Sequence, residues 1–206
     1  MDKSEDESSF IKTSLVGVFK RLTDILELKI ARRYFALNFF DGVVAVLGFI
    51  VNYFFLGGRN PGVLLSSSII IGVGMAISGF TSAMLVEYSE MRREINELEK
   101  ALFRNLGGTR IARTKTVVAI INALINAFAP VLGALAAATP ILLSEVGMLD
   151  FTLGFQLSVA ISLFILFFLG VYLGKHAGSR PIMYGIATAG AGALTAIIAY
   201  ILGGGQ

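Results

Sequence analysis

Residues 152–173 read TLGFQLSVAISLFILFFLGVYL, a run of 22 residues without a charged side chain. A helix needs about 20 predominantly apolar residues to cross the hydrocarbon core of a bilayer, which is about 30 Å thick. Backbone amide and carbonyl groups inside lipid must find their partners within their own segment, so a helix is the form that we expect. The run therefore predicts a membrane-spanning helix.

Four further runs have similar length and apolar character: 34–56, 63–86, 116–143 and 182–202. None shows the alternation of period two that is typical of a membrane barrel strand. The chain of 206 residues is 55% hydrophobic and 15% charged, where a soluble domain carries about 25% charged residues. Its mean hydropathy is +0.78. The sequence predicts an all-α integral membrane protein with five transmembrane helices.

Lysine and arginine are distributed unevenly between the two sides that five spans would create. Sixteen of the 17 lie before the first run, between the second and third, or between the fourth and fifth, and Arg59 alone lies elsewhere. Basic residues accumulate on the cytoplasmic side, so the N-terminus is predicted to be cytoplasmic and the C-terminus extracytoplasmic or lumenal. No cleavable signal is evident. The sequence does not distinguish a plasma membrane from a vacuole-like membrane.

The region before the first run has helical periodicity of a different kind. Between residues 10 and 30, apolar residues recur at helical spacing and charged residues lie mostly elsewhere, which favours an amphipathic helix in the membrane interface. A cytosolic helix docked on the rest of the protein is the alternative. The predicted organisation is a cytoplasmic segment, 1–33, and a five-span domain, 34–206, with a cytoplasmic helical extension at 87–115.

Composition and the absence of known motifs restrict the chemistry. The chain has no cysteine and one histidine, His176, which excludes disulfides, thiolate metal sites and a zinc site with several histidines. A metal site must then use oxygen ligands, with methionine sulfur as a possible addition, and such ligands suit Mg, Mn or Fe(II). No zinc-protease, nucleophile-elbow or phosphate-loop motif occurs. We expect no enzyme, no catalytic residue, no resident cofactor and no nucleic-acid partner.

Asp41 is the first candidate site residue, because it stands about two turns inside the first apolar run, in NFFDGVV at 38–44. A carboxylate at the centre of a spanning helix costs about 2.5–3.5 kcal/mol, and such residues usually face a cavity or a partner. The alternative is an Asp at headgroup depth that caps the helix or pairs with Arg32 or Arg33.

The second apolar run ends in a row of four glutamates: Glu87, Glu90, Glu94 and Glu97. Their offsets of 0, 3, 7 and 10 place them on one face of a continuous helix. Carboxylates on one face repel each other unless a cation lies between them. A divalent metal would serve, as would Arg93 and Lys100. The alternative is a solvated charged face.

Polar and sulfur-containing residues elsewhere in the spans could contribute ligands or helix contacts. Met84 lies three residues before Glu87 in the second run, although a methionine there more often packs than binds metal. Asn122 and Asn126 are one turn apart in the third run and could hydrogen-bond across helices or line a pathway.

Four stretches resemble parts of the vacuolar iron transporter family: DGVVAVLG at 41–48, SGFTSAMLVEYSE at 78–90, FAPVLGA at 128–134 with Thr139-Pro140, and 169–203 from LGVYLGK to AYILG. The resemblance covers residues 30–204 in the same five-span order. It is to a short form, because 87–115 has room for one main helix in place of the family's full cytoplasmic metal-binding domain.

The resemblance implies transport of Fe(II) or Mn(II) out of the cytoplasm in exchange for protons. It further implies a homodimer with the ion path between subunits, lined by Asp41, Met84 and Glu87. Glu90 and Glu94 are then expected to collect metal at the cytoplasmic mouth. Two alternatives stay open: a non-transporting membrane scaffold or assembly protein, and a transporter of another divalent cation such as Mg or Ca.

Overall fold

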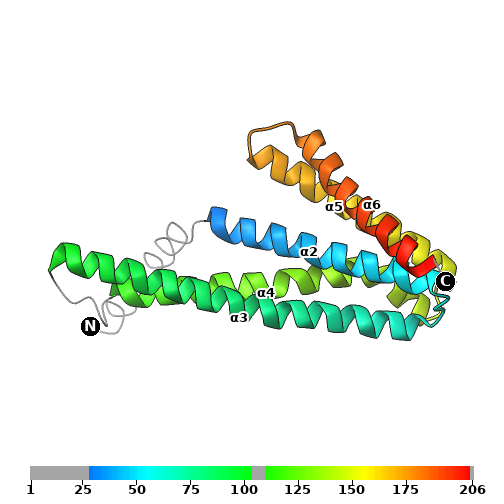
Figure 1. The fold of residues 1–206 in the computed structure, drawn as a ribbon, viewed down its shortest axis with the longest axis horizontal. Coiled ribbons are helices and arrows are strands. Elements are labelled where there is room, and N and C mark those ends of the chain that lie inside the picture. Colours follow the sequence, from blue (N-terminus) through cyan, green and yellow to red (C-terminus); the bar gives the residue numbers. More distant parts are fainter. Residues whose placement is uncertain (1–27, 104–109, 205–206) are drawn as a thin grey trace, which may run out of the picture. The chain divides into compact units, whose positions relative to one another are not determined.

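The computed structural model describes residues 28–103 and 110–204, and within these ranges every regular element is a helix (Figure 1). The helices are α2 (Leu28–Phe55), α3 (Pro61–Leu102), α4 (Arg110–Glu145), α5 (Phe151–His176) and α6 (Pro181–Gly204). The predicted amphipathic helix at 10–30 lies outside the described residues, apart from its last three positions, which belong to α2.

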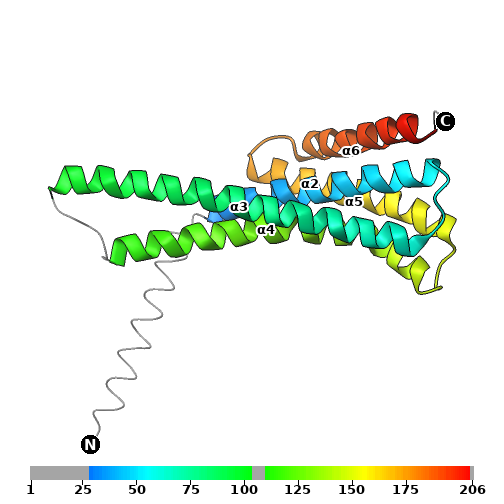
Figure 2. The same cartoon turned by 60° about the horizontal axis from the view of Figure 1, so that its bottom comes forward.

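Within the described residues, five helices are long and apolar enough to cross a membrane, so each of the five predicted apolar runs forms a helix. All five are longer than the predicted runs, α3 by the most. Helix α3 has 42 residues and is about 63 Å long at the rise of an α-helix, about twice the thickness of the hydrocarbon core. Figure 2 shows it as one unbroken helix. The predicted extension at 87–115 therefore contains the end of α3 and the beginning of α4.

The chain divides into two compact units: residues up to Tyr34 together with Thr81–Ile125, and Phe35–Phe80 together with Asn126–Gln206. Helices α2, α3 and α4 each contribute to both units, whereas α5 and α6 belong wholly to the second.

The second unit has a continuous apolar core in which α2 is central. Val43, Val46, Leu47 and Ile50 of α2 are fully buried, and they pack in one cluster with buried residues of the other four helices. Their spacing of three and four residues places them on one side of α2. The core therefore fixes which side of α2 points away from it.

Two glycines let α2 and α4 approach each other closely in this unit. A Cβ atom at Gly42 would collide with the backbone of Pro130, and one at Gly133 would collide with the carbonyl of Phe39. Only a residue without a side chain fits where two backbones meet in this way. The contact sets the rotation of α2 one residue after Asp41.

Helices α5 and α6 form an antiparallel hairpin, visible in both views (Figures 1 and 2). Gly170 of α5 lies against Gly185 and Thr188 of α6, and the Thr188 hydroxyl donates to the Leu166 carbonyl over 2.8 Å. The Asp150 carboxylate caps the N-terminus of α5 by accepting from the Thr152 amide over 2.9 Å, as expected for an N-cap residue.

Candidate functional site

Asp41 is exposed on the surface of the second unit. Residues on either side of it in sequence explain this position: Phe39 and Gly42 pack against α4, and successive residues of a helix differ in direction by about 100°. Asp41 shares the outward side of α2 with Leu37, one turn earlier, which is 51% exposed. Asp41 is nine residues after the start of the candidate span Arg32–Phe55, about 14 Å along the helix axis.

No hydrogen bond or ion pair joins Asp41 to another described residue of its unit. The side chain can therefore accept a partner from outside the chain. The sequence predicted that this carboxylate would face a cavity or a partner. The structure places it on the surface of the second unit, without a partner among the described residues of that unit.

Glu87 has the opposite surroundings in the first unit. Its side chain is half-buried, and its Oε1 atom accepts a hydrogen bond from Asn122 Nδ2 over 3.4 Å. The hydroxyl of Tyr34 also hydrogen-bonds to the Glu87 side chain. Helices α2, α3 and α4 thus each contribute one residue to a polar cluster of Tyr34, Glu87 and Asn122, which we call the Glu87 cluster. Asn122 is only 4% exposed, so this cluster is well ordered by packing.

Two methionines flank Glu87 on the half-buried side of α3. Met84 lies one turn before it and Met91 one turn after it, and both are half-buried. The Met91 sulfur accepts a hydrogen bond from the Thr116 hydroxyl over 3.2 Å. Glu87 and the two thioethers therefore lie on neighbouring turns of one helix, within the first unit.

The other predicted glutamates of α3 differ from Glu87 in burial. Glu90, Glu94 and Glu97 are exposed, and Glu97 forms an ion pair with Arg93 at 3.0 Å. The four glutamates do follow one another along a single continuous helix, as the spacing required. Of the four glutamates, only Glu87 is half-buried. It lies on the same side of α3 as the half-buried Met84 and Met91.

Asn126 organises a second polar contact, in the second unit. Its Nδ2 atom donates to the Gly79 carbonyl over 2.7 Å, and its Oδ1 atom accepts a hydrogen bond from Asn38. Asn122 and Asn126 both bond across helices, so the hydrogen-bonding interpretation of these two asparagines is confirmed.

The predicted metal ligands are divided between the two units: Asp41 belongs to one, and Met84, Glu87, Glu90 and Glu94 belong to the other. Among the described residues, no group of three or more acidic or histidine side chains is arranged to hold a metal ion. A site within one unit would have to use amide, hydroxyl or thioether groups beside a carboxylate. The Glu87 cluster offers such a mixed set.

Tyr34 and Asn38 are the polar residues that sequence reasoning missed. Both lie in the first turns of the first apolar run, where they were counted as part of the span. Their positions on α2, two turns before Asp41 for Tyr34 and one turn before it for Asn38, are a signal that could have been noticed. Their partners on α3 and α4 could not have been found from a single sequence.

No protein-family model, curated protein or solved structure matches the chain. The geometry of the named residues therefore carries the functional argument.

Proposed function

We propose that the protein is a multi-pass membrane transporter of divalent metal ions, Fe(II) or Mn(II) or both, which works as a homodimer and exports metal from the cytoplasm in exchange for protons. The observation that supports this most directly is Asp41: a carboxylate inside a candidate span, exposed on the surface of its unit and without a partner there.

Lipid cannot solvate that carboxylate, because an ionised side chain near the middle of the bilayer costs about 2.5–3.5 kcal/mol even on insertion scales. A second copy of the chain would cover it. In a two-fold dimer the same patch meets itself, so two Asp41 carboxylates would approach each other across the axis. Their repulsion is relieved when a cation lies between them, and a divalent ion does this best.

The ligand chemistry suits borderline metals. Carboxylate oxygens favour hard ions, and in the first unit the thioether of Met84, one turn from the Glu87 carboxylate, adds a softer ligand, a combination suited to Fe(II) and Mn(II). The resemblance to iron transporters points to the same ions. Carboxylates that release metal can take up protons, which provides a means of coupling.

Glu87, Glu90 and Glu94 would serve the approach to this path. All three belong to the part of α3 where charged residues begin, on the side that the distribution of lysine and arginine assigns to the cytoplasm. Exposed carboxylates concentrate cations near a channel mouth. The Glu87 cluster would receive an ion from them with its amide and hydroxyl partners already in place.

The test is metal flux into proteoliposomes that contain the full chain, with an imposed pH gradient and Fe(II) or Mn(II) outside. We expect Asp41→Asn to lower the flux by about tenfold or more, the scale on which metal sites respond to loss of a supporting group. Glu97→Gln is the matched control, because it removes an exposed carboxylate already paired with Arg93. Equal flux in Asp41→Asn and the unmodified protein would contradict the proposal.

A further inference from the structure

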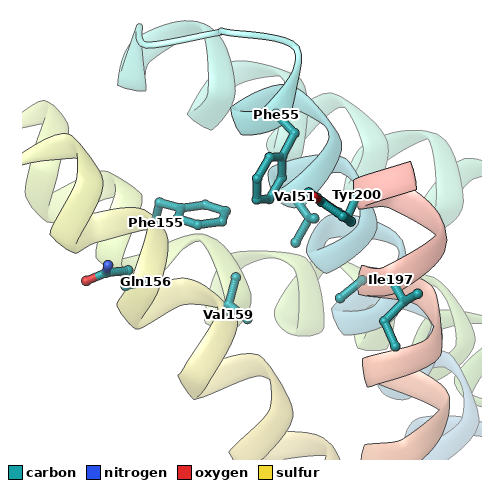
Figure 3. Close-up of a pocket in the computed structure, with 8 residues that line it drawn as sticks. Val51, Phe55, Phe155, Gln156, Val159, Ile197 and Tyr200 are labelled. Atoms are coloured by element: carbon teal, nitrogen blue, oxygen red, sulfur yellow. The ribbon is translucent and has the colours of Figure 1, made fainter. Parts of the chain in front are cut away.

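A groove of about 380 Å³ lies between α2, α5 and α6 in the second unit (Figure 3). Aliphatic side chains of Val51, Val159 and Ile197 and aromatic rings of Phe55, Phe155 and Tyr200 form most of its walls. Tyr200 and Gln156 are the two lining residues with polar side chains. The groove is therefore an apolar slot with polar side chains at only two positions.

The groove begins at one end of the spans and runs inwards. Phe55 is the last residue of α2, and Phe155 and Tyr200 each lie four residues from the end of their helices. Val159 lies eight residues from the start of α5, at a depth of about 12 Å. Every wall residue belongs to a candidate span, so in a membrane that these helices cross, the groove would lie at the depth of the acyl chains of one leaflet.

Arg59 is fixed beside the entrance of this groove. Its Nη1 atom donates to the carbonyls of Phe54 and Gly58 over 2.8 and 2.9 Å, and its guanidinium lies 4.2 Å from the centre of the Phe54 ring. The Phe54 ring stacks on Phe155, a wall residue, with centroids 3.8 Å apart. The arginine is thus held next to the groove by three contacts, and its Nε and Nη2 groups remain available as donors.

Arg59 is also the one basic residue in the connections at this end, 56–60 and 146–150. Two acidic residues lie in or next to these connections. The Asp150 carboxylate caps α5, and the Glu145 side chain lies against Gly62. A guanidinium that is ordered in this way matches a phosphate, to which it can donate two hydrogen bonds at once.

We propose that this groove is a binding site for one glycerophospholipid, with an acyl chain in the slot and the phosphate on Arg59. The apolar slot matches the acyl chain of a phospholipid, and the guanidinium of Arg59 at its entrance matches the phosphate of the headgroup. Tyrosine, here Tyr200, is enriched at the membrane interface. The proposal is independent of the solute that the protein carries.

The chain contains no tryptophan, so one introduced tryptophan reports on the groove alone. Gln156→Trp places it at the groove, and Leu157→Trp places it one residue further along α5, at nearly the same depth and outside the lining. Each full-length variant is titrated in maltoside micelles with phosphatidylcholine brominated on its acyl chains. We expect the fluorescence of Gln156→Trp to be half-quenched at about tenfold less lipid than that of Leu157→Trp. Parallel quenching of the two would overturn the proposal.

Two further variants in the Gln156→Trp background test the two halves of the site. Arg59→Gln is expected to raise the concentration of brominated lipid that half-quenches the tryptophan by about tenfold. Arg180→Gln, in the connection between α5 and α6, is expected to leave that concentration unchanged. Ala196→Phe, which fills the slot, is expected to remove the tenfold difference between the tryptophan at position 156 and that at position 157. Helical circular dichroism shows that each variant is folded.

Competition experiments separate the possible occupants. Inorganic phosphate should not relieve the quenching, and brominated diacylglycerol, which lacks the phosphate, should bind about as weakly as phosphatidylcholine binds the Arg59→Gln variant. Displacement by inorganic phosphate, or equal binding of diacylglycerol, would overturn the assignment of the headgroup. An increase in monomer on Ala196→Phe, without preferential quenching, would show that a second copy fills the groove.

Discussion

Asp41 and Glu87 are both carboxylates in long apolar helices, yet they differ in burial and in hydrogen-bond partners. Glu87 is half-buried and has Asn122 and Tyr34 as hydrogen-bond partners. Asp41 is exposed and has no partner within its unit. An acidic group in a membrane protein needs compensation from some source. For Glu87 the source is its own unit, whereas no described residue of the second unit compensates Asp41.

This difference has a consequence for folding and for assembly. The Glu87 cluster can form as soon as three helices of one chain pack together. In the proposed dimer, a second copy with an ion would complete the surroundings of Asp41. Changes near Asp41 should therefore affect assembly and transport, and changes near Glu87 should affect the stability of the single chain.

The largest effect is expected from a cross-link on the Asp41 side of α2. The chain has no cysteine, so Leu37→Cys introduces a single thiol one turn from Asp41. In a two-fold dimer that covers this side, two such thiols approach each other, and mild oxidation should convert most of the protein to a covalent dimer. Gel electrophoresis without reductant measures this. Leu153→Cys, exposed on α5, is the control, and equal cross-linking of both variants would argue against this dimer.

The next effect concerns the contact that turns Asp41 outwards. Gly42→Ala would place a methyl group against the Pro130 backbone, and we expect a loss of about 2–3 kcal/mol in the free energy of unfolding. Thermal unfolding in detergent measures it. The control is Gly74→Ala, because a methyl group there meets no atom within 4 Å and should be neutral or slightly stabilising. Similar melting temperatures for the two variants would show that α2 and α4 do not need this close approach.

The sequence was sufficient for the spans and insufficient for the contacts between them. Apolar runs and their lengths are local properties, so all five helices could be predicted to within a few residues at most ends. The larger differences are at the starts of α2 and α4, which begin at Leu28 and Arg110, six residues before the predicted runs. The continuation of α3 to Leu102 falls within the helical extension that the charged, helical pattern after Glu87 predicted.

The candidate site could be predicted only in part, for a physical reason. The cost of a charge in lipid identifies Asp41 and Glu87 from the sequence alone. Their surroundings depend on which helix sides meet, and Glu87 and Asn122 are 35 positions apart. The pairing of Gly42 with Pro130 likewise follows from the rotation of two helices. Hydrophobic periodicity does not determine that rotation when a helix is apolar on every side.

A smaller effect is expected at the Glu87 cluster. Asn122→Ala should lower the free energy of unfolding by about 1 kcal/mol, since it removes one hydrogen bond to a charged group and a buried side chain. A double-mutant cycle with Glu87→Ala should give a coupling of about 0.6 kcal/mol, the average for polar pairs in membrane proteins. The matched cycle uses Leu124→Ala, an exposed residue of the same helix. A coupling that is no larger with Asn122 than with Leu124 would remove the cluster as a source of stability.

The smallest effect should come from the exposed ion pair of Arg93 and Glu97. Their side chains are 82% and 63% exposed, and pairs of this kind at a spacing of four contribute about 0.3–0.5 kcal/mol. Arg93→Ala should therefore shift the unfolding midpoint only slightly, and the shift should disappear in about 1 M salt because the attraction is screened. Arg92→Ala is the control, since Arg92 contacts the Tyr88 ring and hydroxyl and no carboxylate. A large, salt-independent loss for Arg93→Ala would mean that this part of α3 is not solvated, and Glu97 would then belong with Glu87 among the carboxylates that the chain compensates itself.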